Sequence, residues 1–241
     1  MENPLEQFEI KKIFPFELNG LDLSFTNSAL CMVITVVVIF LSLSLCLRKR
    51  SIVPTMGQAF SEAVYDFVMN IIGETMGKEG IKYFSLIFTL FTFLSVGNLL
   101  GLFPYSFTFT SHIAAVGTLS FFFLIVNAIF GFRRRGFEYF RNFFPKGLPT
   151  IMAPLIVPIE IISLLAKPFS LTIRLVVNMS VGHIILKVLG TFILTMKIFG
   201  FIPLIADMCI IMFELFVTLL QAYIYTTLSC VYLSQSISEE E

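Results

Sequence analysis

The stretch that decides the fold is SALCMVITVVVIFLSLSLCL, which runs from Ser28 to Leu47. It contains no charged residue. As an α-helix it would be about 30 Å long, which matches the thickness of the hydrocarbon core of a bilayer. The sequence therefore predicts a membrane-spanning helix over residues 28–47.

The composition of the whole chain agrees with a membrane protein. Of its 241 residues, 57% are hydrophobic, and its 13% of charged residues compare with about 25% in ordinary soluble domains. Further uncharged runs predict two more spans, over residues 83–107 and 112–132. Sixteen basic and sixteen acidic side chains leave no net positive charge, so no nucleic acid partner is expected. The composition excludes a freely soluble protein and predicts one all-α membrane domain over residues 1–241.

Two basic clusters orient the predicted spans. Arg48–Arg50 follow the first span and Arg133–Arg135 follow the third, two crossings later. The positive-inside rule places both clusters, and with them the carboxyl terminus, on the cytoplasmic or matrix side, and the segment 1–27 on the other side. Five of the seven charged residues of that segment are acidic, which disfavours a cleavable signal peptide, and no Arg-rich transit peptide is seen. We expect a bacterial inner membrane, with the mitochondrial inner membrane as the alternative.

Residues 56–82 show a different pattern. Apolar side chains recur at helical spacing among charged residues such as Glu62 and Asp66, which predicts an amphipathic helix lying in the membrane interface. Gly73–Lys78 superficially resembles a phosphate-binding loop, but it is one residue too short and Glu79 stands where Ser or Thr is needed. We therefore predict that the chain binds no nucleotide directly.

The last apolar block predicts a long, tilted or bent helical hairpin. Its arms cover residues 148–189 and 200–234, and the chain turns between them. Pro158 and Pro168 interrupt the first arm and predict bends, because proline removes a helical hydrogen bond. Such freed backbone groups are tolerated in a membrane only where they meet protein or water.

Each arm of the hairpin carries polar residues seven positions apart. In the first arm they are Glu160, Lys167 and Arg174, and in the second they are Asp207, Glu214 and Gln221. Seven residues fall only about 20° short of two helical turns, so each set lies on one helical face. Ionisable groups at membrane depth cost from roughly 2.5 to more than 10 kcal/mol, so they normally face protein or water. The two stripes are predicted to line hydrated crevices or to face another subunit.

The side chains in these arms suggest a proton route. Glu214 and His183 can exchange protons, whereas Arg174 cannot, because its pKa lies above about 12. A permanent cation repels hydronium and divides such a route into two halves. It also forces a carboxylate within about 4 to 6 Å to release its proton. A mobile carboxylate on a partner could then carry protons from one half to the other.

These residues resemble subunit a of the F-type ATP synthase. Residues 170–179, SLTIRLVVNM, resemble the family's signature around its essential arginine, and Phe213–Glu214 with Gln221–Ile224 resemble its final-helix signature. Supporting matches are NPLEQF at 3–8, NLLGLFPYSF at 98–107, Thr110–His112, Ile159–Glu160 and Lys167–Pro168. The His183 and Glu214 pair is similar to the alphaproteobacterial and mitochondrial arrangement.

The resemblance implies a role for each matched residue. Arg174 would face the carboxylate of a rotating c-ring, with Gln221 near it across the hairpin. The half-channel open to the amino-terminal side would be lined by Asn178, His183 and Glu214, and Glu160 would lie toward the other exit. The expected partners are the c-ring proteolipid, the peripheral-stalk b subunits and the lipid bilayer. No cofactor or metal is expected, and ATP chemistry would belong to other subunits.

Two other classes of protein remain as alternatives. A self-contained secondary transporter could use Glu160, Lys167 and Arg174 as a substrate site, but such proteins usually show paired repeats of spans, and none is seen here. A redox membrane subunit is disfavoured because two histidines cannot supply four haem ligands. The favoured prediction is a non-enzymatic proton-channel stator subunit.

Overall fold

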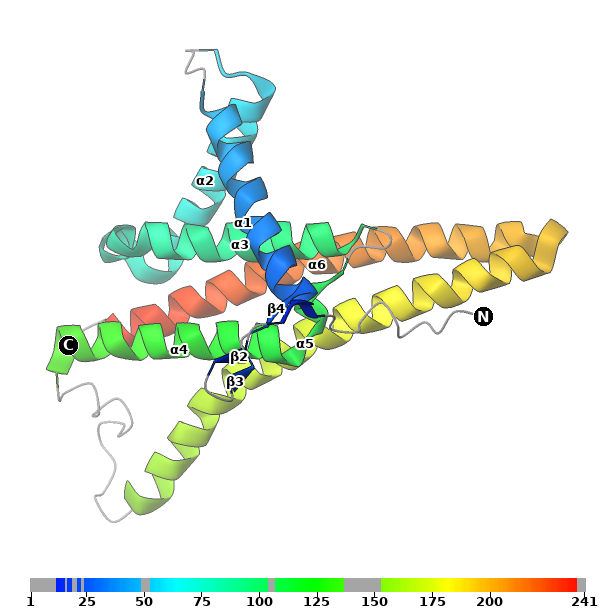
Figure 1. The fold of residues 1–241 in the computed structure, drawn as a ribbon. Coiled ribbons are helices and arrows are strands. Elements are labelled where there is room, and N and C mark those ends of the chain that lie inside the picture. The colour runs from blue at the N-terminus through cyan, green and yellow to red at the C-terminus, as the bar shows by residue number, and fades with distance from the viewer. Residues whose placement is uncertain are drawn as a thin grey trace.

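The computed structural model describes residues 12–15, 17–18, 21–22, 24–48, 53–103, 107–136 and 153–237. Within these residues the chain is almost entirely helical, which confirms the predicted helical class (Figure 1). The motif at 3–8, the basic residues Lys49 and Arg50, and the start of the predicted hairpin at 148–152 lie outside the described residues.

The helical elements follow one another along the chain. They are α1 (Asn27–Cys46), α2 (Met56–Met76), η2 (Gly77–Tyr83), α3 (Phe84–Gly101), η3 (Phe109–Ser111), α4 (Ile113–Arg135), α5 (Ala153–Met196), η6 (Lys197–Gly200) and α6 (Phe201–Ile237). Five helical segments of the described chain are long and apolar enough to cross a membrane: α1, α2 to α3 taken together, α4, α5 and α6. The protein is thus an integral multi-pass membrane protein.

The segment from 56 to 101 differs in detail from its prediction. α2, η2 and α3 follow one another without a break, and α3 ends at Gly101 rather than at the expected residue 107. Part of the apolar face of α2 is covered by protein, because Val68 and Ile72 are fully buried in a cluster with Cys230 and Leu233 of α6. Helical periodicity predicted this apolar face but not which surface would cover it.

The amino-terminal segment contains four short strands that were not predicted. β1 (Lys12–Phe14) pairs with β4 (Phe25–Thr26), and β2 (Glu17–Leu18) pairs with β3 (Leu21–Asp22), both antiparallel. Aromatic and β-branched residues favour strands, and the Asn-Gly dipeptide at 19–20 is a typical hairpin signal in the sequence. The sequence analysis expected no strand in this segment, so the two short strand pairs add a local detail to a helical fold.

The core lies where α3, α4, α5 and α6 pack side by side. α3 and α5 run one way, and α4 and α6 run the other way, whereas α1 crosses this bundle steeply (Figure 1). Leu94 of α3, Val116 of α4, Leu175 of α5 and Tyr225 of α6 are each at most 2% exposed. Large apolar side chains cover the outer surface, as expected for a protein whose solvent is lipid.

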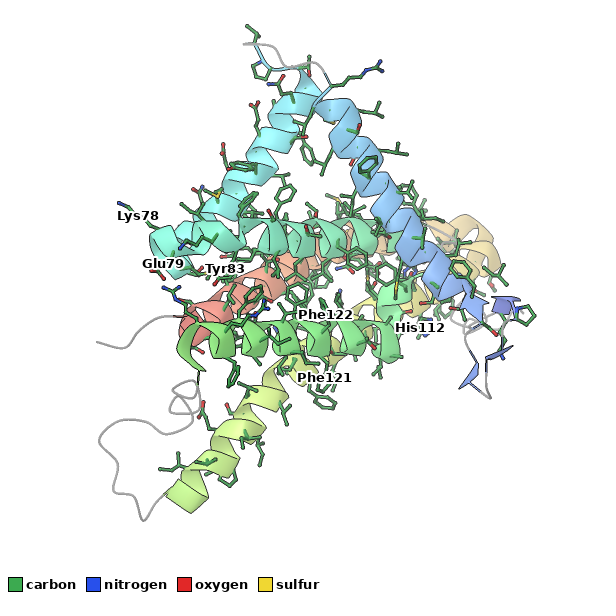
Figure 2. All side chains as sticks on the ribbon, turned by 60° about the vertical axis from the view of Figure 1, so that its left-hand side comes forward. Lys78, Glu79, Tyr83, His112, Phe121 and Phe122 are labelled. Carbon is green, nitrogen blue, oxygen red and sulfur yellow. The ribbon has the colours of Figure 1, made fainter. Side chains whose placement is uncertain are left out.

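One end of the bundle gathers basic and acidic side chains. The carboxyl ends of α4 and α6 lie at this end (Figure 1). There the Arg134 guanidinium forms an ion pair with the Glu79 carboxylate of η2, and Tyr83 meets Phe130 with ring centroids 5.1 Å apart. Figure 2 shows Glu79 and Tyr83 at this end and His112 at the other end of α4. The ion pair ties the turn between α2 and α3 to the end of α4.

The hairpin of α5 and α6 is longer than any other pair of helices in the described chain. α5 has 44 residues and α6 has 37, and the two join through the short η6. α5 changes direction in its amino-terminal part (Figure 1), and this part contains Pro158 and Pro168. The bend agrees with the missing helical hydrogen bonds that proline causes.

Candidate functional site: buried polar groups of the α5–α6 hairpin

The polar stripe of α6 faces the interior of the bundle. Glu214 is 3% exposed, Thr218 and Gln221 are 1% exposed, and Tyr225 is 2% exposed. Spacings of three, four and seven residues place these side chains on one helical face. The seven-residue pattern found in the sequence is therefore a buried polar face between helices.

Arg174 of α5 faces the opposite way. Leu175 and Met179 point inward and are at most 1% exposed, whereas Arg174 is exposed on the outer surface. Thr172, two residues before Arg174, is only 4% exposed. Two residues correspond to about 200° around a helix, so Thr172 and Arg174 lie on opposite sides of α5. Arg174 therefore does not face the polar stripe of α6, which points into the protein.

Glu214 reaches α5 at a glycine. A Cβ atom added at Gly182 would lie 2.6 Å from Cδ and 3.1 Å from Oε2 of Glu214, closer than side chains pack. Only glycine leaves room for the carboxylate to lie against the α5 backbone at this point. Because His183 is the next residue along α5, the acid and the imidazole belong to the same region of the hairpin.

His183 is held by a residue from the segment before α4. The Thr108 hydroxyl lies 3.1 Å from Nε2 of His183 and donates a hydrogen bond of 3.1 Å to the carbonyl oxygen of Gly101. Both Thr108 and His183 are buried, at 1% and 6% exposure. Gly101 allows this approach, because a Cβ there would lie 2.6 Å from Cγ2 of Thr108. The end of α3, the segment before α4, and α5 thus meet at one imidazole.

Several buried polar atoms of this region lack a hydrogen-bond partner within the described part of the chain. They are both carboxylate oxygens of Glu214, Nε2 of Gln221, Nδ2 of Asn178, Oδ1 of Asp207 and both polar atoms of the Asn98 amide. Buried polar groups in proteins almost always have a partner, often an ordered water. The interior between α3, α5 and α6 is therefore suited to hold water along these side chains.

Two points about the site remain: the position of Glu160 and the presence of side chains that could bind a metal ion. Glu160 is half-buried on α5, well before Arg174 in the chain, and the side chain of Lys167 lies outside the described part. No hydrogen bond or ion pair joins Arg174 to Gln221 within the part of the chain that the structure describes. Among the same residues, no group of three His, Cys, Asp or Glu side chains is placed to hold a metal ion.

The structure adds two residues that sequence reasoning missed. Thr108 lies in a segment without periodicity, so no pattern indicated that it would meet an imidazole 75 positions away. Gly182 carried a weak signal, because glycine inside an apolar helix is often required for close packing. That weak signal does not show that the partner of Gly182 is Glu214.

Buried acid, imidazole and amide groups between membrane-spanning helices define a multi-pass membrane protein suited to ion passage. The profile of the family described as ATP synthase A chain matches residues 29–234. The ATP synthase subunit a of Rhodospirillum rubrum is 46% identical over 239 residues, covering 99% of each chain. Those of Paramagnetospirillum magneticum and of a Wolbachia strain from Drosophila simulans are 42% and 45% identical, over 98% of this chain and 99% and 98% of theirs.

The chain belongs to the ATP synthase A chain family. This membership assigns it to the membrane sector of the ATP synthase, as its proton-translocating subunit. Nothing in these comparisons favours the secondary-transporter alternative.

Proposed function

We propose that the chain is the stator half of the proton path, with two offset half-channels that meet a rotating c-ring at Arg174. Protons would pass from one half-channel to a c-ring carboxylate and leave through the other. Their passage would drive rotation. In this proposal the chain has no catalytic activity of its own, and ATP is handled elsewhere in the complex.

The observation that carries this proposal is the position of Arg174. Its guanidinium is exposed on the outer face of α5 among lipid-facing residues, such as Ile173 at 40% and Val177 at 50% exposure. No acidic side chain pairs with it among the described residues. A cation in hydrocarbon costs roughly 2.5 to more than 10 kcal/mol, so this surface requires an anion from another chain. A rotor carboxylate supplies that charge.

The buried polar face supports a separate role for the interior. Glu214 and His183 can take up and release protons, and the polar atoms of Asn178 and Gln221 can bind the water that connects them. We assign Glu214, His183 and Asn178 to the half-channel open to the amino-terminal side, and Gln221 to the neighbourhood of Arg174. Glu160, half-buried at the far end of the hairpin, is assigned to the other exit.

The family of the chain and the position of its arginines suggest its partners, its membrane and its orientation. The partners are the c-ring proteolipids, the peripheral-stalk b subunits and the bilayer. The carboxyl ends of α4 and α6 share one end of the bundle with Arg133 and Arg134, which supports a cytoplasmic location for that end (Figure 1). We place the chain in a bacterial inner membrane. α1, α3 and α4 are proposed as spans, α2 as an interfacial helix, and α5 with α6 as a tilted hairpin.

The decisive variant is Arg174→Ala in the reconstituted complex. Without the cation, protons can pass between the half-channels without rotation, so ATP-driven proton pumping should be lost while passive proton leak is retained or raised. Dye quenching in inverted vesicles measures both. Arg133→Ala, which removes an exposed arginine at the end of α4, is the matched control and should pump normally. Unchanged pumping by Arg174→Ala would refute the proposal.

A further inference from the structure

Three hydroxyl groups meet inside the bundle, one from each of α4, α5 and α6. Oγ of Ser120 accepts hydrogen bonds from Thr172 Oγ1 at 2.9 Å and from the Tyr225 hydroxyl at 3.1 Å. The three side chains are 3%, 4% and 2% exposed. The same Thr172 oxygen lies 2.8 Å from the carbonyl oxygen of Pro168, so the cluster includes the bent part of α5. None of these residues belongs to the proposed proton path.

The hydrophobic effect alone cannot set the rotation of α5 about its axis. The inward face carries Leu171, Leu175 and Met179, and the outward face carries Ile173 and Val177. Both faces thus carry large apolar side chains, and lipid is as apolar as the protein interior. In a membrane the hydrophobic effect therefore does not distinguish the two faces. Directional bonds between helices can do so.

Thr172 provides such a bond close to Arg174. The two residues lie about 200° apart around α5, so any rotation that keeps Thr172 bonded to Ser120 keeps Arg174 on the outer surface. Tyr225 lies one turn beyond Gln221 on α6 and bonds the same oxygen. Ser120 therefore fixes α5 and α6 in rotation and in depth against one shared point on α4.

We propose that Ser120, Thr172 and Tyr225 are positioning residues that set the rotation of α5 and thereby aim Arg174 at the rotor. We call this cluster of three residues the coupling clasp. Its effect on coupling rests on the proposed function of Arg174, whereas its effect on helix rotation does not. The two parts can therefore be tested separately.

The first experiment measures coupling in the reconstituted complex. Thr172→Val and Tyr225→Phe remove one hydroxyl each with little change of shape. Both should lower ATP-driven proton pumping several-fold relative to ATP hydrolysis. Thr172→Ser keeps the hydroxyl group and should pump normally. Thr226→Val is the matched control. The Thr226 hydroxyl is equally buried, but among the described residues it bonds only the Ala222 carbonyl oxygen of its own helix, at 2.8 Å. Normal coupling in both clasp variants would overturn the proposed effect on coupling.

The second experiment reads the rotation of α5 without the rotor. The full-length chain, with its four cysteines replaced by alanine, carries a nitroxide label at 173 or at 176 in lipid vesicles. Ile173 is 40% exposed and Val176 is 7% exposed, so collisions with oxygen should be frequent at 173 and rare at 176. Thr172→Val should reduce this contrast and Thr226→Val should not.

The two readouts separate the possible failures. An unchanged contrast between 173 and 176 in Thr172→Val would overturn the positioning role, whatever the pumping rate. A reduced contrast with normal coupling would support positioning by the clasp and count against the proposed function of Arg174. A reduced contrast together with reduced coupling supports both.

Discussion

Gly182→Ala tests whether the Glu214 carboxylate must lie against α5. The new methyl group would be 2.6 Å from Cδ of Glu214, where carbon atoms normally pack at about 3.5 to 4.0 Å. The carboxylate must therefore move by about 1 Å, or α5 and α6 must separate by a similar amount. Either change displaces the acid from the region of His183.

The expected cost in stability is small, and the expected cost in function is large. Overpacking a buried site costs about 1–3 kcal/mol, and replacing glycine by alanine in a helix regains about 0.5–1 kcal/mol, so the net destabilisation is between about 0 and 2.5 kcal/mol. Misplacing a reacting group by 1 Å can cost up to about 100-fold in rate. Proton flux should therefore fall by about ten- to 100-fold in a complex that still assembles.

The assay is proton flux into inverted vesicles, measured by dye quenching, with assembly checked by copurification of the complex. Gly190→Ala is the control on the same helix, because a Cβ there meets no atom within 4 Å. A shorter acid should relieve the overlap, so adding Glu214→Asp to Gly182→Ala should recover part of the flux, although Glu214→Asp alone should reduce it. Normal flux in Gly182→Ala, or no recovery in the double variant, would contradict the contact between Gly182 and Glu214.

Three further changes test other parts of the structure. Thr108→Val removes the hydroxyl between His183 and the Gly101 carbonyl, so it should destabilise the fold by about 1–3 kcal/mol and slow proton flux, whereas Thr108→Ser should do neither. Glu79→Gln breaks a partly exposed ion pair with Arg134, and denaturation should show a loss of at most about 1 kcal/mol that shrinks in high salt. Burial lowers the pKa of His112, so the unfolded chain binds the proton more tightly; the melting temperature should fall as the pH drops below about 6.5, and His112→Phe should reduce that fall.

The sequence predicted the membrane class and the order of the helices well, because both depend on local properties. The uncharged run at 28–47 corresponds to α1 within one residue at each end, and the run that ends at 132 corresponds to α4. Helix ends were less predictable where proline or glycine intervenes, as at Gly101, since the apolar run continues beyond the helix. The strands before α1 were missed because their pairing joins residues that no periodic pattern connects.

The candidate site was predictable by residue type but not by orientation. The seven-residue spacing placed Glu214 and Gln221 on one face of a helix, and spacing cannot say whether that face turns inward. The structure buries both of them and exposes Arg174. No pattern indicated Thr108, and Gly182 carried only a weak signal, because the importance of both consists of contacts with distant residues.

The sequence by itself determined that the chain lies in a membrane, where its helices run, and which ionisable side chains it carries into the bilayer, since each follows from hydropathy and helical spacing. Only the tertiary structure decided that the acid and the imidazole point into the bundle while the arginine points out. The physical reason is that apolar side chains on α5 are no worse placed against lipid than against protein, so its rotation depends on hydrogen bonds to other helices, such as that of Thr172 with Ser120.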